Sequence, residues 1–210
     1  AGNYDYKANT YETNKINLLS NPTSLYTKQP TVYYGLMYLA KNAKKEVKIH
    51  TPYIICNDYM YKELKNIKVP TTIMTNSAEN NGNIFGAVDY LNHKKDIINT
   101  GVTIKEYEGG ISYHGKSMTI DDDIAIVGSF NMDMRSAYID TELMLVINSK
   151  DINKQLKASM EEYEKKAATV KNETEYSHIP EGMKMKELSD KNKNIKAWFG
   201  WAMNGLRFLF

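Results

Sequence analysis

The sequence predicts an α/β fold in which a mixed sheet, mainly of the parallel type, is flanked by helices. Two patterns predict it. As far as residue 101, segments with apolar residues at helical spacing alternate with short strand-like runs, the pattern of βαβ units. Three closely connected strand candidates then follow, before a last amphipathic helix. With 210 residues, the chain is long enough for one domain with a substantial core.

The first hundred residues supply three helices and the strands between them. Helices are expected over 32–43, 60–67 and 84–101, the second capped near Asn57 or Asp58 and the third ended by Gly101. EVKIHTPYI and PTTIMTN read as buried strands, and the polar SAENNGN reads as a loop. The helical positions are Val32, Leu36, Leu39 and Ala43, then Met60, Leu64 and Ile67, then Ile84, Val88 and Leu91.

Strands dominate the next part of the chain. VTIKEYE, KSMTI, IAIVGS and TELMLVI are each strand-like, and the turn-forming DDD joins the second run to the third. A helix is expected after Ser149, which places helices on both sides of these strands. One face of that helix comprises Ile152, Leu156, Met160, Tyr163 and Ala167.

The sequence divides into one domain over 1–167, a polar linker or irregular arm over 168–192, and an aromatic amphipathic helix over 193–210. The last segment, KAWFGWAMNGLRFLF, combines an aromatic surface with nearby basic residues, a composition that could dock on a membrane interface. Packing against the domain or against a missing neighbour is the favoured alternative, because aromatic stripes at helical spacing are usually core. The residues concerned are Trp198, Phe199, Trp201, Leu206 and Phe208 to Phe210, with Lys193, Lys196 and Arg207.

Composition excludes several kinds of protein. A formal net charge of +2 lacks the strongly basic character of most nucleic-acid-binding domains. The single cysteine, Cys56, excludes an internal disulfide and a multi-cysteine metal site, and its apolar neighbours predict buried packing. No ligand cluster for zinc or calcium is evident, so we predict no metal and no cofactor. No apolar run approaches the length that spans a bilayer, and any membrane segment is expected upstream.

The segment HGKSMTIDDDIAIVGSFN carries the chemistry. His114 and Lys116 would share one face of a strand, where the imidazole supplies a nucleophile or proton carrier and the ammonium holds developing phosphoryl charge. Gly128 suits a close backbone approach, and Ser129 and Asn131 offer small hydrogen-bond donors. The GSFN run alone would read as an ordinary turn. Its position behind the histidine and lysine predicts a site for phosphoester transfer.

These residues resemble the signature of the phospholipase D superfamily. His114, Lys116 and Asp121 match its HxKxxxxD motif, and GSFN matches its GSxN element at the family's spacing. MDMRSAYIDTELMLVI is similar to the stretch after the second motif of bacterial cardiolipin synthase and phospholipase D-like proteins. AKKEVKIHTPYII and VTIKEYEGGISYHGKS also resemble the family, so the resemblance covers residues 16 to 165.

The resemblance implies a ping-pong reaction. His114, or its counterpart in a second copy of the motif, attacks phosphorus to form a phosphohistidine, and the other histidine protonates the leaving alcohol. Lys116 would neutralise a nonbridging oxygen, and Ser129 and Asn131 would donate hydrogen bonds to the phosphoryl group. Glu142 sits where the family places a carboxylate that orients the imidazole, although a solvated charge on an edge strand is an alternative interpretation.

Other polar residues are expected to be structural. Asp121 follows the strand-like KSMTI and opens the DDD turn, which is a structural position. His50, His93 and His178 lie outside the motif, and a lone histidine is usually structural.

The implied mechanism needs two motifs, and this chain contains one. Two halves can lie in one polypeptide, or two single-motif chains can form a homodimer. The run from Asn17 to Ile55 resembles the start of a second half, so we favour a C-terminal half that pairs with an N-terminal half. On this interpretation, the isolated chain could be folded yet inactive.

The leading hypothesis is an enzyme of bacterial phospholipid metabolism, associated with the membrane, that resembles phospholipase D or cardiolipin synthase and hydrolyses phosphodiesters or transfers phosphatidyl groups. The runner-up is a homodimeric single-motif phosphodiesterase or nuclease, for which salt-sensitive nucleic-acid binding would be required. The third is a non-catalytic half that binds phosphate or lipid headgroups.

Overall fold

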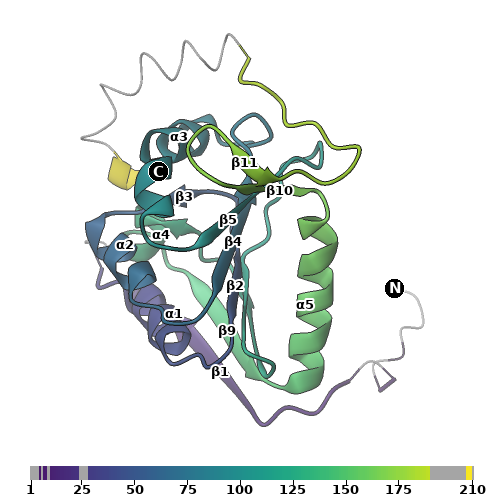
Figure 1. Ribbon diagram of the computed structural model, residues 1–210. Coiled ribbons are helices and arrows are strands. Elements are labelled where there is room, and N and C mark those ends of the chain that lie inside the picture. Colours follow the sequence, from purple (N-terminus) through teal and green to yellow (C-terminus); the bar gives the residue numbers. More distant parts are fainter. Residues whose placement is uncertain (1–4, 6, 9, 24–27, 190–206, 210) are drawn as a thin grey trace.

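A sheet of nine strands runs through the middle of the computed structural model, which describes residues 5, 7–8, 10–23, 28–189 and 207–209 (Figure 1). In spatial order the strands are β1-β9-β7-β6-β2-β4-β5-β10-β11. Their bounds are β1 (Lys15–Ser20), β2 (Val47–His50), β4 (Thr71–Asn76), β5 (Thr103–Tyr107), β6 (Ser117–Ile120), β7 (Ile124–Gly128), β9 (Leu143–Asn148), β10 (Ala167–Val170) and β11 (Tyr176–His178). A separate two-stranded sheet pairs β3 (Ile54–Ile55) with β8 (Met132–Asp133).

The α/β class and the mixed, helix-flanked sheet are confirmed, but the predicted predominance of parallel strands is wrong. Among the described strands of the large sheet, only β2–β4 and β4–β5 pair in parallel, and the six other ladders are antiparallel. The parallel pairs are those whose connections contain α2 (Asp58–Lys65) and α3 (Ile84–Ile98). A parallel pair needs such a crossover, and the three-residue turn between β6 and β7 is too short to provide one.

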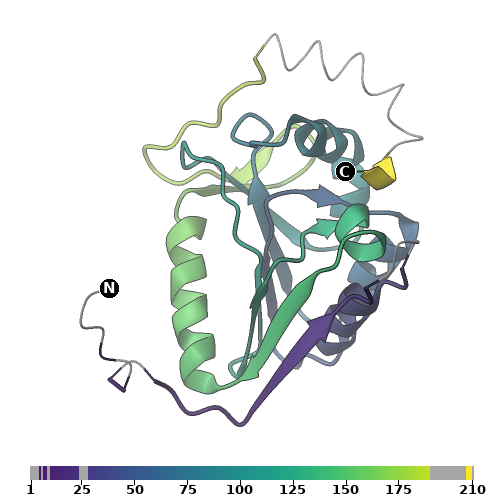
Figure 2. The ribbon, with the colours of Figure 1, turned by 180° about the vertical axis from the view of Figure 1, so that it is seen from behind.

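Helices α1 (Thr31–Lys41), α2 and α3 cover one face of the sheet, and α5 (Lys150–Glu164) covers the other (Figures 1 and 2). All four were predicted from local apolar periodicity. The Asn57 side chain accepts a hydrogen bond from the Met60 amide at 2.9 Å and caps α2 as expected. The main apolar core fills the space between the sheet and α1 to α3, and it includes Tyr33, Leu36, Ile49, Leu64, Ile97 and Ile126.

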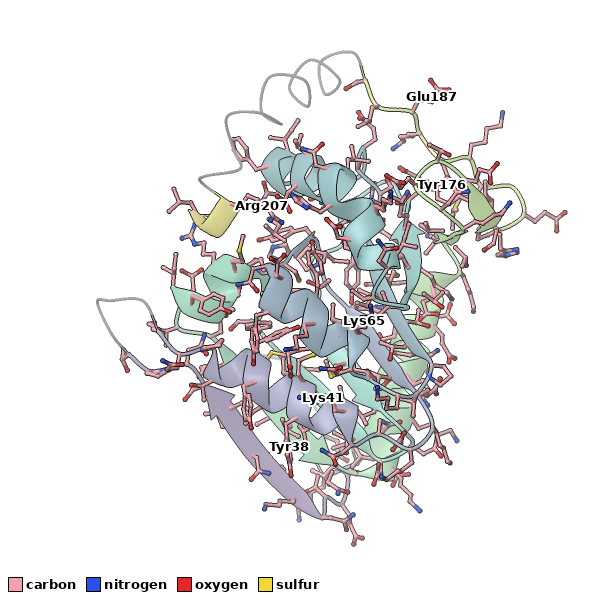
Figure 3. The ribbon with its side chains drawn as sticks, turned by 60° about the vertical axis from the view of Figure 1, so that its left-hand side comes forward. Tyr38, Lys41, Lys65, Tyr176, Glu187 and Arg207 are labelled. Atoms are coloured by element: carbon pink, nitrogen blue, oxygen red, sulfur yellow. The ribbon has the colours of Figure 1, made fainter. Side chains whose placement is uncertain are left out.

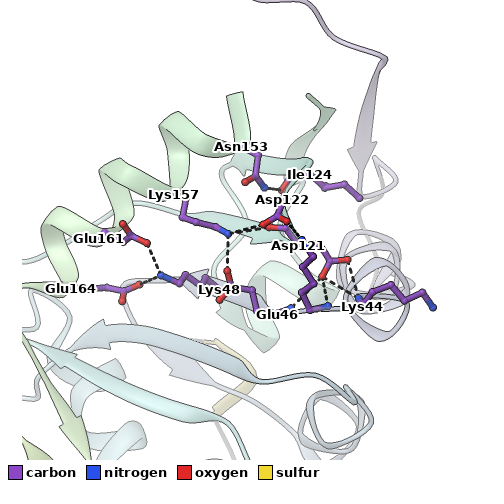
Figure 4. Close-up of polar contacts among 11 residues, drawn as sticks. Lys44, Glu46, Lys48, Asp121, Asp122, Ile124, Asn153, Lys157, Glu161 and Glu164 are labelled. Carbon is purple, nitrogen blue, oxygen red and sulfur yellow. Dashed lines mark hydrogen bonds and ion pairs between the residues drawn. The ribbon is translucent and has the colours of Figure 1, made fainter. Parts of the chain in front are cut away.

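Helix α5 is attached to the sheet largely by charged side chains, as Figure 4 shows. Lys48 on β2 is 3.1 Å from Glu161, and Lys157 is 2.7 Å from Glu46. Of the apolar face predicted for this helix, Met160 is buried, whereas Tyr163 is 42% exposed. The face of the sheet under α5 is therefore more polar than the opposite face.

The polar segment predicted as a linker from residue 168 instead begins as part of the sheet. β10 pairs antiparallel with β5, and β11 pairs with β10 to form the edge. The Tyr176 hydroxyl donates a hydrogen bond to Glu106 on β5, which anchors this hairpin. The strands are four and three residues long, too short for an alternating pattern to stand out in a polar sequence.

The end of the chain lies against the domain at one described point. Arg207, in the short 3-10 helix Arg207–Leu209 (Figure 3), donates to Asp89 of α3 at 2.6 Å and to the Cys56 carbonyl oxygen at 2.9 Å. The Cys56 side chain is buried as predicted, and burial raises the pKa of its thiol. Most of the predicted C-terminal helix, with Trp198 and Trp201, lies outside the described residues. None of the described helices is long and apolar enough to cross a bilayer.

Candidate active site

His114 and Lys116 lie in the extended segment that leads into β6, rather than within the strand. The Gly128 amide donates to the Lys116 carbonyl oxygen at 3.2 Å, so the contact with β7 reaches back to this residue. The two motif side chains touch, because Lys116 Nζ lies 2.8 Å from Nδ1 and 3.2 Å from Nε2 of His114. The predicted juxtaposition of imidazole and ammonium is present.

The surroundings of His114 favour a neutral ring. Partial burial, and then the charge of Lys116, lower the pKa of His114. Burial also lowers the pKa of Lys116, although Glu142 and Asp133 oppose this by attraction. At neutral pH the imidazole therefore retains a lone pair, which a nucleophile needs, beside a group that can meet negative charge.

Gly128 ends β7 and lies opposite Met144 of β9. A Cβ atom at this position would lie 2.1 Å from the Leu143 carbonyl oxygen and 2.6 Å from the Met144 sulfur. The close approach expected of Gly128 is therefore to the neighbouring strand. The next residue, Ser129, continues the contact, because its amide donates to the Leu143 carbonyl oxygen at 2.9 Å.

Glu142 is a buried carboxylate beside the GSFN turn. It accepts hydrogen bonds from the hydroxyls of Ser129 and Ser136, the latter at 3.0 Å. Among the described residues, the Glu142 carboxylate has no hydrogen-bond partner other than these two hydroxyls, so it makes no hydrogen bond to His114. Since the Ser129 hydroxyl donates its proton to Glu142, it must turn away before it can donate to a phosphoryl oxygen.

Asn131 is held on two sides. Its Nδ2 donates to the Tyr53 hydroxyl at 3.2 Å, and its backbone amide donates to Ser136 Oγ at 3.3 Å. Its Oδ1 is buried and has no hydrogen-bond partner among the described residues. Asn131 thus has a buried, unused acceptor and one engaged N–H, and the second N–H of its amide is left to donate.

Asp121 lies at the opposite end of β6 from His114 and has positive φ, 52°. Its carboxylate accepts hydrogen bonds from the backbone amides of Lys44, Lys45 and Glu46, at 2.9, 2.7 and 3.2 Å (Figure 4). Burial acts to raise its pKa, but these three donors hold the pKa of Asp121 below its ordinary value. The contacts tie the turn after β6 to the start of β2.

Two cavities meet at His114. The larger, 640 Å³, is lined by Lys116, Val127 and the ring of Tyr163, among others. The smaller, 390 Å³, is lined by Tyr53, Asn83 and other uncharged residues. The imidazole borders both, so reactants could approach it from two directions. No cluster of three metal-ligating side chains occurs in the described residues.

A comparison with known protein families assigns the sequence that forms this site to a family. The family described as "Cardiolipin synthase, PLD-like domain" matches residues 36–163, more than half of the chain. The chain belongs to the phospholipase D superfamily. This phospholipase D-like match spans the sheet from β2 to β9 and includes His114, Lys116 and the GSFN turn.

Bacterial cardiolipin synthases are among its curated relatives. Cardiolipin synthase 1 of Staphylococcus epidermidis (strain ATCC 12228) is 30% identical over 159 residues, which make up 74% of this chain and 32% of the relative. Cardiolipin synthase of Staphylococcus aureus (strain Mu50) is 31% identical over 129 residues, 60% of this chain and 26% of the relative. The phospholipase D-like chain spans about a third or less of the length of these relatives.

Two solved structures share the fold. The phospholipase D family member Nuc from Salmonella typhimurium superposes with a TM-score of 0.59 at 16% identity, over 74% of this chain and 97% of that one. Phosphatidylserine synthase from Haemophilus influenzae superposes with a TM-score of 0.66 at 15% identity, over 93% of this chain and 48% of that one. The same fold thus makes up nearly all of one chain and about half of another.

Sequence reasoning gave no role to two hydroxyls that the phospholipase D-like fold brings to the site. Tyr53 follows β2, and residues that follow a central strand are good candidates for a site in α/β proteins. Ser136 contacts both Glu142 and Asn131 from α4 (Met134–Tyr138). Its partners lie only five and six residues away in the sequence, but no motif marks Ser136, because the path of α4 decides that the three side chains meet.

Proposed function

We propose that this chain forms half of an active site that hydrolyses phospholipid phosphodiesters or transfers phosphatidyl groups through a phosphohistidine. One observation carries the proposal: a neutral imidazole, His114, contacts the Lys116 ammonium where two open cavities meet. The match to a family described as cardiolipin synthase supports phospholipids as substrates.

In the proposed first step, an imidazole nitrogen of His114 bonds to phosphorus while the bond to the leaving alcohol breaks. A histidine from a second half gives its proton to that alcohol. In the second step, water or another alcohol gives up its proton to the second histidine and displaces His114 from phosphorus.

Other residues of the motif are proposed to serve the phosphoryl group. The Lys116 ammonium, at the end of a flexible stem, is proposed to leave its contacts with His114 and bind a nonbridging oxygen. Ser129 and Asn131 are proposed donors, with Ser129 leaving Glu142 when substrate binds. Glu142 is proposed to act in one of two ways. It orients a histidine, or it fixes the orientation of the Ser129 hydroxyl by accepting its hydrogen bond.

A second half is proposed to cover the exposed sheet face beside the site. Leu18 of β1 and Val127 of β7 flank Leu145 on this face, and they are 61% and 38% exposed. Val127 also lines the larger cavity with His114. An apolar strip that borders half a site supports docking of a partner. The greater length of the cardiolipin synthases supports an N-terminal half as that partner.

A homodimer is the second candidate assembly. The fold of this chain covers 97% of Nuc, which favours the idea that one such domain can make a complete polypeptide. In that case the enzyme would be a single-motif phosphodiesterase, and nucleic acid would be an alternative substrate. Near-neutral net charge argues for lipid, because phosphate-backbone binding depends on basic residues.

The decisive experiment is to trap the intermediate. Protein is quenched after mixing with a phosphodiester labelled in its phosphoryl group, first alone and then with the N-terminal half of a cardiolipin synthase. We expect acid-labile, base-stable label on His114, absent in His114→Asn and retained in the exposed control His178→Asn. Turnover by the chain alone would indicate the homodimer, and turnover that survives His114→Asn would refute the mechanism.

Membrane contact through the C-terminal segment is also proposed, supported by its aromatic and basic composition. Co-sedimentation with anionic liposomes should fall when the last fifteen or so residues are deleted. Unchanged co-sedimentation would leave packing on the domain, as seen for Arg207, as the role of this segment.

A further inference from the structure

The segment that carries His114 has little regular structure of its own. Residues 108–116 connect β5 to β6, and the segment contains two consecutive glycines, Gly109 and Gly110. Such a segment needs external contacts to hold a nucleophile in place, because each free backbone residue carries substantial conformational entropy.

Asn76, the last residue of β4, makes several polar contacts near this segment, and its side chain is almost fully buried. Its Oδ1 accepts from the Tyr113 amide at 2.7 Å, and its Nδ2 donates to the Tyr113 carbonyl oxygen at 2.9 Å. Nδ2 also donates to the Pro52 carbonyl oxygen at 2.8 Å. One amide therefore binds both backbone groups of the residue before His114, and the backbone just before Tyr53.

A second amide supports the first. Asn80 Nδ2 lies 3.3 Å from Asn76 Oδ1 and 3.3 Å from the Ile111 carbonyl oxygen. On the other side, the Tyr113 hydroxyl lies 3.3 Å from His50 Nδ1, and its ring packs against Tyr163 with centroids 4.8 Å apart. The backbone and the side chain of Tyr113 are thus fixed by different elements.

We propose that Asn76 is a positioning residue for the reaction, because its side-chain amide holds the Tyr113 backbone and so sets where the His114 imidazole meets phosphorus. This inference rests on the proposed function of His114. This contact needs the carbonyl oxygen and the NH2 group of one buried side-chain amide. A carboxylate lacks the two N–H donors, and alanine lacks both donors and acceptor.

Asn76→Asp tests this with a built-in control. At high pH the introduced carboxylate repels the carbonyl oxygens of Pro52 and Tyr113. On the side of the following residue, Glu108 accepts from the Ser77 hydroxyl and is itself paired with Lys186 at 3.1 Å. At low pH the neutral acid keeps the acceptor and regains one donor. The matched variant is Asn153→Asp, since Asn153 is similarly buried and donates to the Ile124 carbonyl oxygen at 2.7 Å, at the far end of β7 (Figure 4).

Turnover is measured from pH 5.5 to 8. The assay uses the assembly in which the wild-type chain is active, either the homodimer or the chain with an N-terminal half. A misplaced nucleophile should lower kcat of Asn76→Asp by roughly 100-fold at pH 8 with little change in KM, and the ratio to wild type should recover about tenfold at pH 5.5. Asn153→Asp should keep a constant ratio near one. A milder variant, Asn80→Ala, should lower kcat several-fold and guards against misfolding of Asn76→Asp.

Side-chain NMR of His114 in the chain alone provides a readout that needs no turnover. Its imidazole resonances should shift or split in Asn76→Asp at pH 8 and stay unchanged in Asn153→Asp. Two results together would overturn this inference and leave the proposed function standing. Turnover would be lost in His114→Asn, and kcat would be unchanged in Asn76→Asp and Asn80→Ala. Turnover that persists in His114→Asn would refute the proposed function, and unchanged His114 resonances in Asn76→Asp would then refute the positioning contact as well.

Discussion

Replacing Gly128 with alanine should destabilise the protein, because the added methyl group would meet backbone. The new Cβ would lie 2.1 Å from the Leu143 carbonyl oxygen, whereas carbon and oxygen normally approach to about 3.3 Å. The ends of β7 and β9 would have to separate by roughly 1.2 Å. Overpacking of this kind costs about 1–3 kcal/mol, and each weakened ladder hydrogen bond adds about 1 kcal/mol. We expect Gly128→Ala to lower the free energy of unfolding by about 3 kcal/mol.

The assay is urea unfolding followed by circular dichroism, with Gly35→Ala as the matched control. Gly35 lies inside α1, and its added Cβ would lie 3.0 Å from Cδ1 of Leu19, the end of a flexible side chain. Alanine in a helix interior gains about 1 kcal/mol over glycine, so the control should be neutral or slightly more stable. Equal free energies of unfolding for Gly128→Ala and Gly35→Ala would refute this reasoning. So would a loss of less than about 1 kcal/mol in Gly128→Ala relative to wild type.

Three further predictions concern stability and reactivity. Burial raises the pKa of Asp133 to about 6, so its contribution to stability falls as pH rises from about 4 to 6. Asp133→Asn should therefore stabilise the protein at pH 8, by at most about 3 kcal/mol, and have little effect at pH 4; equal effects at both pH values would contradict this. Asp121→Ala removes the acceptor of three backbone amides and should cost about 2 kcal/mol in urea unfolding, where no loss would show the cap to be dispensable. The buried Cys56 thiol should react with a disulfide reagent only on unfolding, and rapid reaction of native protein would show that it is accessible.

Helices were predictable because their signals are local. The apolar spacing of α1, α2 and α3 lies within 11, 8 and 15 consecutive residues, and the cap at Asn57 lies next to its helix, so no distant contact is needed to predict them. Strand direction was not predictable in the same way. β6 could pair only antiparallel with β7 across its short turn, but its antiparallel pairing with β2 depends on how the whole sheet assembles.

The site shows the same division. His114, Lys116 and the GSFN turn could be found in the sequence because they fall within eighteen residues of one another. The partners of Glu142 and the reason for Gly128 could not be found. Ser136 meets Glu142 through the path of α4, and Gly128 is required by the carbonyl oxygen of a residue on another strand.

The sequence by itself determined the superfamily and the residues of the candidate site, since the spacing of a short motif specifies residue types and their order. Tertiary structure alone decided that partial burial lowers the pKa of His114, that Ser129 is engaged by Glu142, and that Asn76 holds the backbone before His114. The physical reason is that hydrogen bonding, burial and electrostatic shifts depend on distances between atoms, and the fold sets those distances for residues far apart in the chain.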